Sequence, residues 1–138
     1  MRVEDVLRRP RARVPLLVLG FASLLAGIAG GLARLGFEPM PVSDEGVVLH
    51  GALLASGFFG TVIALERAVA LDRFWGYAAP LACGAGGLAL AAGAPLAGVL
   101  LMLGGALALL AMSAVFLGRQ RSLESWTMAG GEIGRAHV

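Results

Sequence analysis

Long runs of apolar residues, separated by short polar segments, dominate the chain. Residues 14–33 contain no charged side chain, and further apolar runs cover about 46–65, 77–93 and 95–117. An α-helix rises about 1.5 Å per residue, so about 20 residues cross the roughly 30 Å hydrocarbon core of a bilayer. The pattern therefore predicts an all-α fold, a polytopic transmembrane helix bundle with four spans in the region 14–131.

A fifth apolar segment starts near Trp126 and is soon interrupted. A natural membrane protein rarely stops a few residues into a span, so we expect a truncated fifth helix and an N-terminal fragment of a longer protein. The last residues, EIGRAHV at 132–138, agree, because one reading frame of a common sequencing adapter encodes IGRAHV and a stop. We expect this tail to be adapter-encoded, which removes His137 as a candidate ligand. The alternative is a genuine polar C-terminus.

An arginine-rich segment, residues 1–13, precedes the first span. Arginines before an apolar run also suit a signal peptide, but a signal core is only about 7–15 residues long. Because 14–33 is longer and more spans follow, we expect the first helix to be retained.

The arginines also predict the orientation. With the N-terminus inside, the outer loop between the first two spans holds one arginine, Arg34. Positive charge accumulates on the cytoplasmic side of membrane proteins. We therefore expect a multi-pass protein of the bacterial inner membrane with a cytoplasmic N-terminus. The inner segments hold Arg2, Arg8, Arg9, Arg11, Arg13, Arg67, Arg73, Arg119 and Arg121.

Composition supports a membrane protein, with 58% hydrophobic residues, 14% charged residues and a mean hydropathy of +0.83. The net charge of +2 does not indicate nucleic-acid binding, because the arginines lie at the ends of apolar runs. A single cysteine, Cys83, excludes an internal disulfide and a CxxC motif. No nucleotide-binding loop, nucleophile elbow or HExxH motif occurs, so no catalytic residue is identified. The expected partners are the lipid bilayer, the missing C-terminal helices and other membrane subunits.

Small residues recur every four positions in three of the spans. In lipid, such ridges let helix backbones approach closely, so we expect helix packing there. The alternative is that a chain rich in Ala and Gly produces these spacings by chance. The ridges are Ala52, Ser56, Gly60, Ala64 and Ala68; Ser23, Gly27 and Gly31; and Ala79, Cys83, Gly87 and Ala91.

His50 is the strongest candidate for chemistry. An ionisable residue inside a span is a functional hypothesis by default, and neutral imidazole binds haem iron or copper. The alternative is an interfacial histidine bonded to the outer loop or to water. His50 shares a helix face with Gly57 and Thr61, which would line a cofactor slot or a helix contact. Met102 matches its depth as a second haem ligand, although methionine in a span is usually packing. Cys83 differs in depth by roughly 15 Å and cannot share an ion.

Three charged residues mark the inner end of the second span. Glu66 and Arg67 are adjacent, so they do not face each other, and we interpret them as boundary anchors. Glu66 is also a candidate for an ion pair with Arg73 or for proton transfer at an inner gate.

The segment HGALLASGFFGTVIALERAVAL, from His50 to Leu71, weakly resembles the NnrS family of haem- and copper-containing membrane proteins. In that family a histidine opens the second helix ahead of a Gly-Phe step, as His50 and Gly57-Phe58 do here. The family pattern has several histidines near this point, whereas this chain has one. The resemblance implies a haem- or copper-binding protein with His50 as a ligand. The alternatives are a permease or channel subunit, and a scaffold of a membrane complex.

Overall fold

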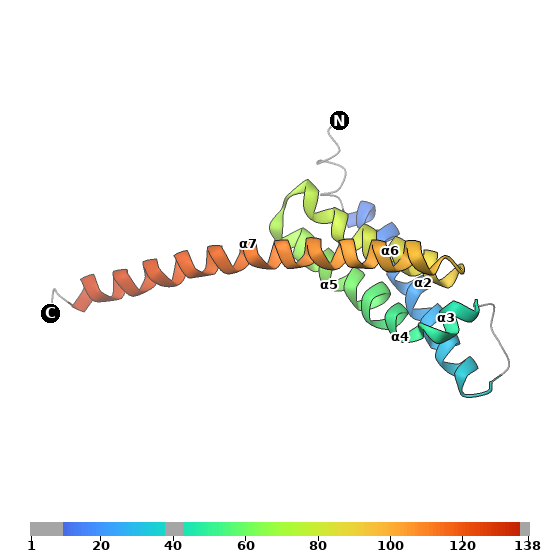
Figure 1. Cartoon of the computed structure of the whole chain (residues 1–138). Coiled ribbons are helices and arrows are strands. Elements are labelled where there is room, and N and C mark those ends of the chain that lie inside the picture. Colours follow the sequence, from blue (N-terminus) through green and yellow to red (C-terminus); the bar gives the residue numbers. More distant parts are fainter. Residues whose placement is uncertain (1–9, 38–42, 136–138) are drawn as a thin grey trace.

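The computed structural model describes residues 10–37 and 43–135, with side chains for residues 13–37 and 43–118. Every regular element among these residues is a helix (Figure 1). Four helices are long and apolar enough to cross a membrane, which confirms the predicted all-α bundle. They cover Arg13–Arg34, His50–Leu71, Phe74–Ala91 and Pro95–Gly118.

The first candidate span lies on α2 (Pro10–Arg34). The chain turns after it at Gly36, whose φ of 86° is a left-handed conformation that glycine adopts without strain. Ser43 then caps the next helix, because its side chain accepts a hydrogen bond of 3.1 Å from the backbone N–H of Gly46.

The sequence predicts one continuous helix over about 46–65, but the structure has four helical pieces here, of which the first precedes the second span and the other three form it. They are α3 (Asp44–Val48), α4 (His50–Ala52), the π-helix η1 (Leu53–Phe59) and α5 (Gly60–Leu71). The helix also extends six residues past Leu65. It ends at Asp72, which is left-handed with φ of 53°, a conformation that aspartate tolerates better than most residues.

The third span begins with a 3₁₀ turn, η2 (Phe74–Tyr77), and continues as α6 (Ala78–Ala91). A tight turn follows, with Gly93 at φ of 83°, and α7 (Pro95–Arg135) starts at a proline. Proline suits the first position of a helix, because its missing N–H would have no partner there.

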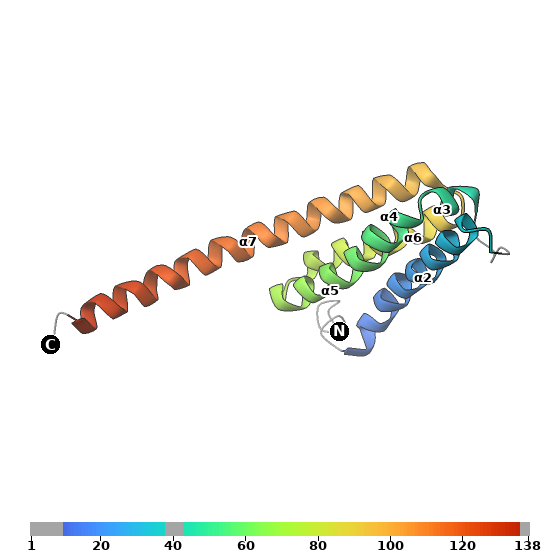
Figure 2. The ribbon, with the colours of Figure 1, turned by 90° about the horizontal axis from the view of Figure 1, so that it is seen from below.

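α7 runs without a break for 41 residues. The position near Trp126, where a fifth span was expected to start, therefore lies on the same helix as the fourth span. The helix extends well past the other three spans in both views (Figures 1 and 2). Of the tail at 132–138, residues 132–135 belong to α7 and 136–138 lie outside the described residues.

Glycines bring the helix backbones into direct contact in the core. A methyl group at Gly86 on α6 would lie 2.8 Å from the carbonyl oxygen of Gly98 on α7. A methyl group at Gly98 would lie 2.9 Å from the carbonyl oxygen of Gly86. Close backbone approach of this kind stabilises membrane helix pairs through van der Waals contact. Two apolar clusters complete the core: Leu53, Leu90 and Met102; and Ala64, Ala68, Leu71, Ala79 and Met112.

Candidate functional site

His50 lies at the break between α3 and α4. Leu49 leaves the helical conformation, with φ of −101° and ψ of 21°, and α4 begins at His50. The imidazole is half-buried, and its Nδ1 lies 2.9 Å from the carbonyl oxygen of Val47. The break therefore leaves a backbone carbonyl within reach of the ring.

This hydrogen bond determines which ring nitrogen carries the proton. A carbonyl oxygen only accepts, so Nδ1 of His50 is the donor and the neutral ring has its lone pair on Nε2. Metal-binding histidines in proteins are usually held in the same way, with one ring N–H donated to a carbonyl or carboxylate. The geometry therefore presents Nε2 as a free ligand atom.

Glycines of α2 form the surface against which His50 packs. A methyl group at Gly30 would lie 3.1 Å from Cβ of His50, and one at Gly31 would lie 3.5 Å from its Cδ2. A methyl group at Gly27 would meet the His50 carbonyl oxygen at 3.3 Å. The sequence predicts Gly27 and Gly31 as packing residues, but it gives no signal that their partner is His50. The GIAGG run over 27–31 is the only hint.

The residue that follows His50 is also a glycine. Gly51, the next residue, is exposed, and a methyl group there would meet no atom within 4 Å. Glycines therefore lie on both elements beside the half-buried imidazole, Gly30 and Gly31 on α2 and Gly51 on α4.

The π-helix η1 follows directly after α4, the short helix that begins at His50 and ends at Ala52. Its wider turns are seen in the bond from the Gly60 N–H to the Ala55 carbonyl, five residues earlier. Single π-turns inside α-helices occur frequently at functional sites. The sequence gives no sign of this turn, because a π-turn has no distinct pattern of apolar residues.

Gly57 and Thr61, expected on one face with His50, form a helix contact rather than a slot. Both are buried. A methyl group at Gly57 would lie 2.8 Å from Cβ of Ser23 on α2 and 3.4 Å from Cα of Gly87 on α6. Thr61 is fully buried, and its hydroxyl donates to the Gly57 carbonyl at 2.6 Å. The face of Gly57 and Thr61 is therefore filled by α2 and α6.

The structure does not bring Met102 to His50. Met102 is 6% exposed and packs with Leu53 and Leu90, while His50 faces α2. Cys83 lies beside Gly60, ten residues and therefore roughly 15 Å of helical rise from His50. Among the described residues, no group of three or more His, Cys, Asp or Glu side chains is placed to hold a metal ion.

The predicted packing ridge on the second span is only partly buried. Its first three members, Ala52, Ser56 and Gly60, are half-buried, whereas Ala64 and Ala68 are fully buried. Gly60 does meet α6, since a methyl group there would lie 3.2 Å from Sγ of Cys83.

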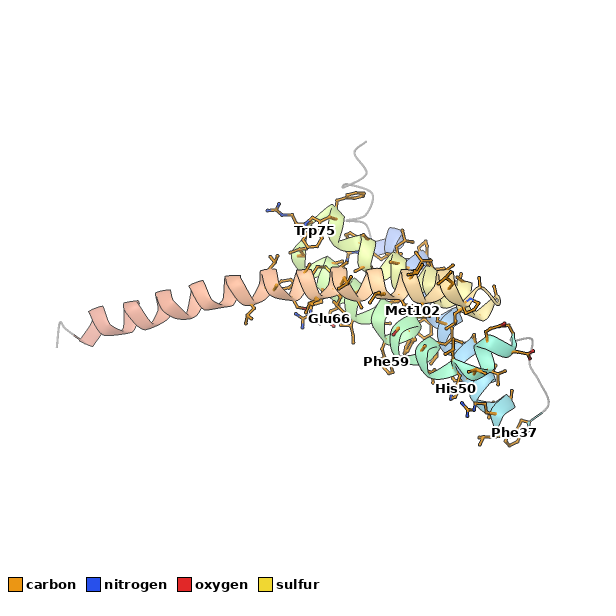
Figure 3. The ribbon with its side chains drawn as sticks, in the orientation of Figure 1. Phe37, His50, Phe59, Glu66, Trp75 and Met102 are labelled. Atoms are coloured by element: carbon orange, nitrogen blue, oxygen red, sulfur yellow. The ribbon has the colours of Figure 1, made fainter. Side chains whose placement is uncertain are left out.

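The charged residues of the second span lie at the end opposite to His50, as the labelled side chains of His50, Glu66 and Trp75 show (Figure 3). Glu66 is exposed, and no ion pair to it is present among the described side chains, so the expected bond to Arg73 does not appear there. Arg67 is exposed too, but its guanidinium lies 5.7 Å from the ring centre of Phe116 on α7. This cation–π contact joins α5 to α7.

Comparison with known proteins gives a family but no activity. The pattern that defines DUF8744, a domain of unknown function, matches residues 13–136. Comparisons with curated proteins and with solved structures each gave no match. With nearly its whole length covered by this one pattern, the chain belongs to the DUF8744 family.

Proposed function

We propose that this protein is an integral inner-membrane protein that binds haem or copper, with Nε2 of His50 as a ligand. The observation that carries the proposal is the hydrogen bond of Nδ1 to the Val47 carbonyl, which orients the ring and leaves Nε2 unprotonated. The glycines around the ring and the adjacent π-turn support the same site. The resemblance of the segment from His50 to Leu71 to the NnrS pattern agrees with it.

Haem fits the described residues better than copper does. Haem iron is held by one proximal histidine in several protein classes. Copper sites in proteins use several nitrogen or sulfur ligands, and no second such group lies near His50 among the described residues. Copper would therefore need ligands from another chain or from helices outside this one.

Haem titration of the purified chain tests the proposal. We expect one haem per chain, with a Soret band that shifts on binding. His50→Ala should weaken haem binding by about 100-fold or more. Losing a residue that only hydrogen-bonds to a metal ligand already lowers metal affinity by about 10- to 100-fold, and His50 is proposed to be the ligand itself. Free imidazole should restore the spectrum of His50→Ala. Gly51→Ala is the matched control, because it changes the neighbouring residue without removing a ligand atom. Equal affinity of wild type and His50→Ala for both haem and copper would refute the proposal.

A scaffold of a membrane complex is the second candidate, favoured by the exposure of α7. Its span is the least buried of the four. Leu96, Leu107 and Leu110 are each more than half exposed. Other membrane helices would cover this face. Gly104→Leu tests this, because a methyl group at Gly104 would meet no atom of another described helix within 4 Å. Loss of a co-purifying subunit in this variant, with the bundle intact, would favour the scaffold.

Transport gains no support from the described core. Its two buried polar side chains, Ser23 and Thr61, both donate to carbonyls of their own helices. A transport site usually needs broken helices and polar groups near the middle of the bilayer. The π-turn, which follows the break at Leu49, has no polar side chain among its buried positions, Leu53 and Gly57.

A further inference from the structure

A separate apolar pocket lies at the opposite end of the bundle from His50. Its volume is about 310 Å³, at the lower end of the range for ligand pockets. It lies between the first turns of α2 and the start of the third span. It is lined by Pro15, Leu16, Phe74, Trp75, Tyr77, Ala78 and Leu81.

The pocket lies at the level where two candidate spans begin. The first span starts at Arg13 and the third at Phe74. Trp75, labelled in Figure 3, is 42% exposed. With Phe74 and Tyr77 it supplies the aromatic part of the pocket lining. Tryptophan and tyrosine are enriched where the hydrocarbon core of a membrane meets its headgroups. The pocket is therefore placed to receive the upper part of a lipid tail.

Two arginines lie next to the lining residues. Arg13 is three residues before Leu16, so the two are neighbours on the surface of α2. Arg73 is exposed and directly precedes Phe74. Guanidinium groups bind phosphate through paired hydrogen bonds. The pocket is apolar, and an arginine lies beside it in each of the two chain segments that line it. This combination matches a molecule with an apolar tail and an anionic head.

We propose that this pocket binds one acyl chain of an anionic phospholipid, whose phosphate lies beside Arg73. The leaflet is the one on the side of the N-terminus. A transmembrane helix, about 10 Å across, is too wide for a pocket of this volume, whereas an acyl chain is not. The site does not depend on the proposed function, because it uses none of the residues around His50.

Fluorescence quenching by brominated lipids tests the proposal in the complete chain. The protein has two tryptophans, so Trp126→Phe leaves Trp75 as the sole tryptophan, which is excited selectively over tyrosine at the long-wavelength edge of its absorption. The variant is reconstituted into vesicles that contain acyl-brominated phosphatidylglycerol or acyl-brominated phosphatidylcholine at the same mole fraction. Bulk lipid around the protein quenches equally with either headgroup. A specific anionic site should favour phosphatidylglycerol by about fivefold in relative affinity for each arginine involved.

Two pairs of variants test the charge and the pocket separately. Arg73→Gln should lower the preference for phosphatidylglycerol by about fivefold, whereas Arg34→Gln, at the far end of α2, should leave it unchanged. Ala78→Phe should fill the pocket and reduce quenching by both lipids. Ala70→Phe is its control, because Ala70 is equally exposed on α5 but does not line the pocket.

The comparison of the two lipids needs no variant beyond the removal of Trp126, so misfolding of a pocket variant cannot decide the outcome. Equal quenching by both lipids would refute an anionic lipid site. Absence of quenching by either lipid, together with cross-linking of Trp75 to a second chain, would show that protein covers the pocket and would also refute it. Native mass spectrometry should show one retained phosphatidylglycerol per chain.

Discussion

Ser23, Gly57 and Gly87 illustrate how single residues hold three helices together. Ser23 is fully buried on α2, and its hydroxyl donates to the Leu19 carbonyl at 3.1 Å. Gly57 on the second span and Gly87 on the third span leave room for the Cβ atom of Ser23. A polar side chain is tolerated here because its hydrogen bond stays within its own helix and its neighbours have no side chains.

Gly87→Ala should therefore destabilise the bundle. Its methyl group would overlap Oγ of Ser23 and lie 3.3 Å from Cα of Gly57. Overpacking of a filled core typically costs about 1–3 kcal/mol, and we expect the unfolding midpoint in detergent to fall accordingly. Gly104→Ala, where the methyl group meets no atom within 4 Å, should leave the midpoint unchanged or raise it. Recovery of the midpoint in Gly87→Ala with Ser23→Gly would identify the overlap as the cause; an unchanged midpoint in Gly87→Ala alone would contradict it.

For single residues, the sequence predicts that small side chains lie in helix contacts, but it does not predict which residue each of them contacts. Small residues at four-residue spacing correctly indicated that backbones approach each other, and Ser23, Gly27 and Gly87 do lie in helix contacts. On the second span the predicted ridge is buried at Ala64 and Ala68 but only half-buried at Ala52 and Ser56, because an Ala- and Gly-rich helix has small residues on every side. Only the contact with Ser23 shows that Gly57, rather than Ser56, faces the core.

The second span is the element in which local structure departs most from a regular helix. Leu53, Gly57 and Thr61 are all buried, although residues spaced by four drift around an ordinary α-helix. A π-turn uses more residues per turn, so these three stay closer to one line. The His50 end of the span faces α2, and Thr61 packs against both Gly20 of α2 and Gly84 of α6.

Deletion of Ala55 should be tolerated. Ala55 is exposed within the π-helix, and its loss would let the remaining residues form ordinary α-turns without rotating the two flanking segments. Deletion of the exposed Ile63 in α5 should be far more damaging, since it rotates the two halves of a regular helix by about 100°. Monodisperse elution and helicity in detergent measure both. Equal loss of folded protein in the two deletions would argue against this role for the π-turn.

Helix positions follow from apolar length, which is why four spans could be predicted. The residues at which a helix begins and ends are predicted less accurately from the apolar pattern. The second span was expected to end near Leu65 because Glu66 and Arg67 are charged, yet the helix continues to Leu71. The aliphatic part of the Arg67 side chain is long enough for the guanidinium to reach Phe116, so the charge need not end the helix. The break at Leu49 depends on its tertiary contacts and is invisible in the local pattern.

For the whole molecule, the distribution of arginines leads to a topology prediction. Residues beside the outer loop should face away from the cytoplasm, and residues in the turn after α5 should face into it. In a Cys83→Ala background, an impermeant maleimide should label Glu45→Cys in intact spheroplasts. It should label Arg73→Cys only after lysis. Both positions are exposed, so access within the protein does not differ. The reverse labelling pattern would show that the outer loop faces the cytoplasm and would contradict the predicted topology.

Ser23 and Thr61, the two buried polar side chains of the described core, affect whether an ion or a proton can cross the middle of the bundle. Among the described side chains, the ionisable groups other than the buried thiol of Cys83 lie toward the two ends of the helices, and the hydroxyls between them are engaged with their own backbone. An ion or proton crossing the middle would exchange its hydration shell for hydrocarbon and helix backbone, a cost of several kcal/mol that nothing there offsets. This part of the protein is thus an insulator. Under the proposed function, an ionic reactant would therefore reach His50 from the membrane face nearest to it rather than through the middle of the described bundle.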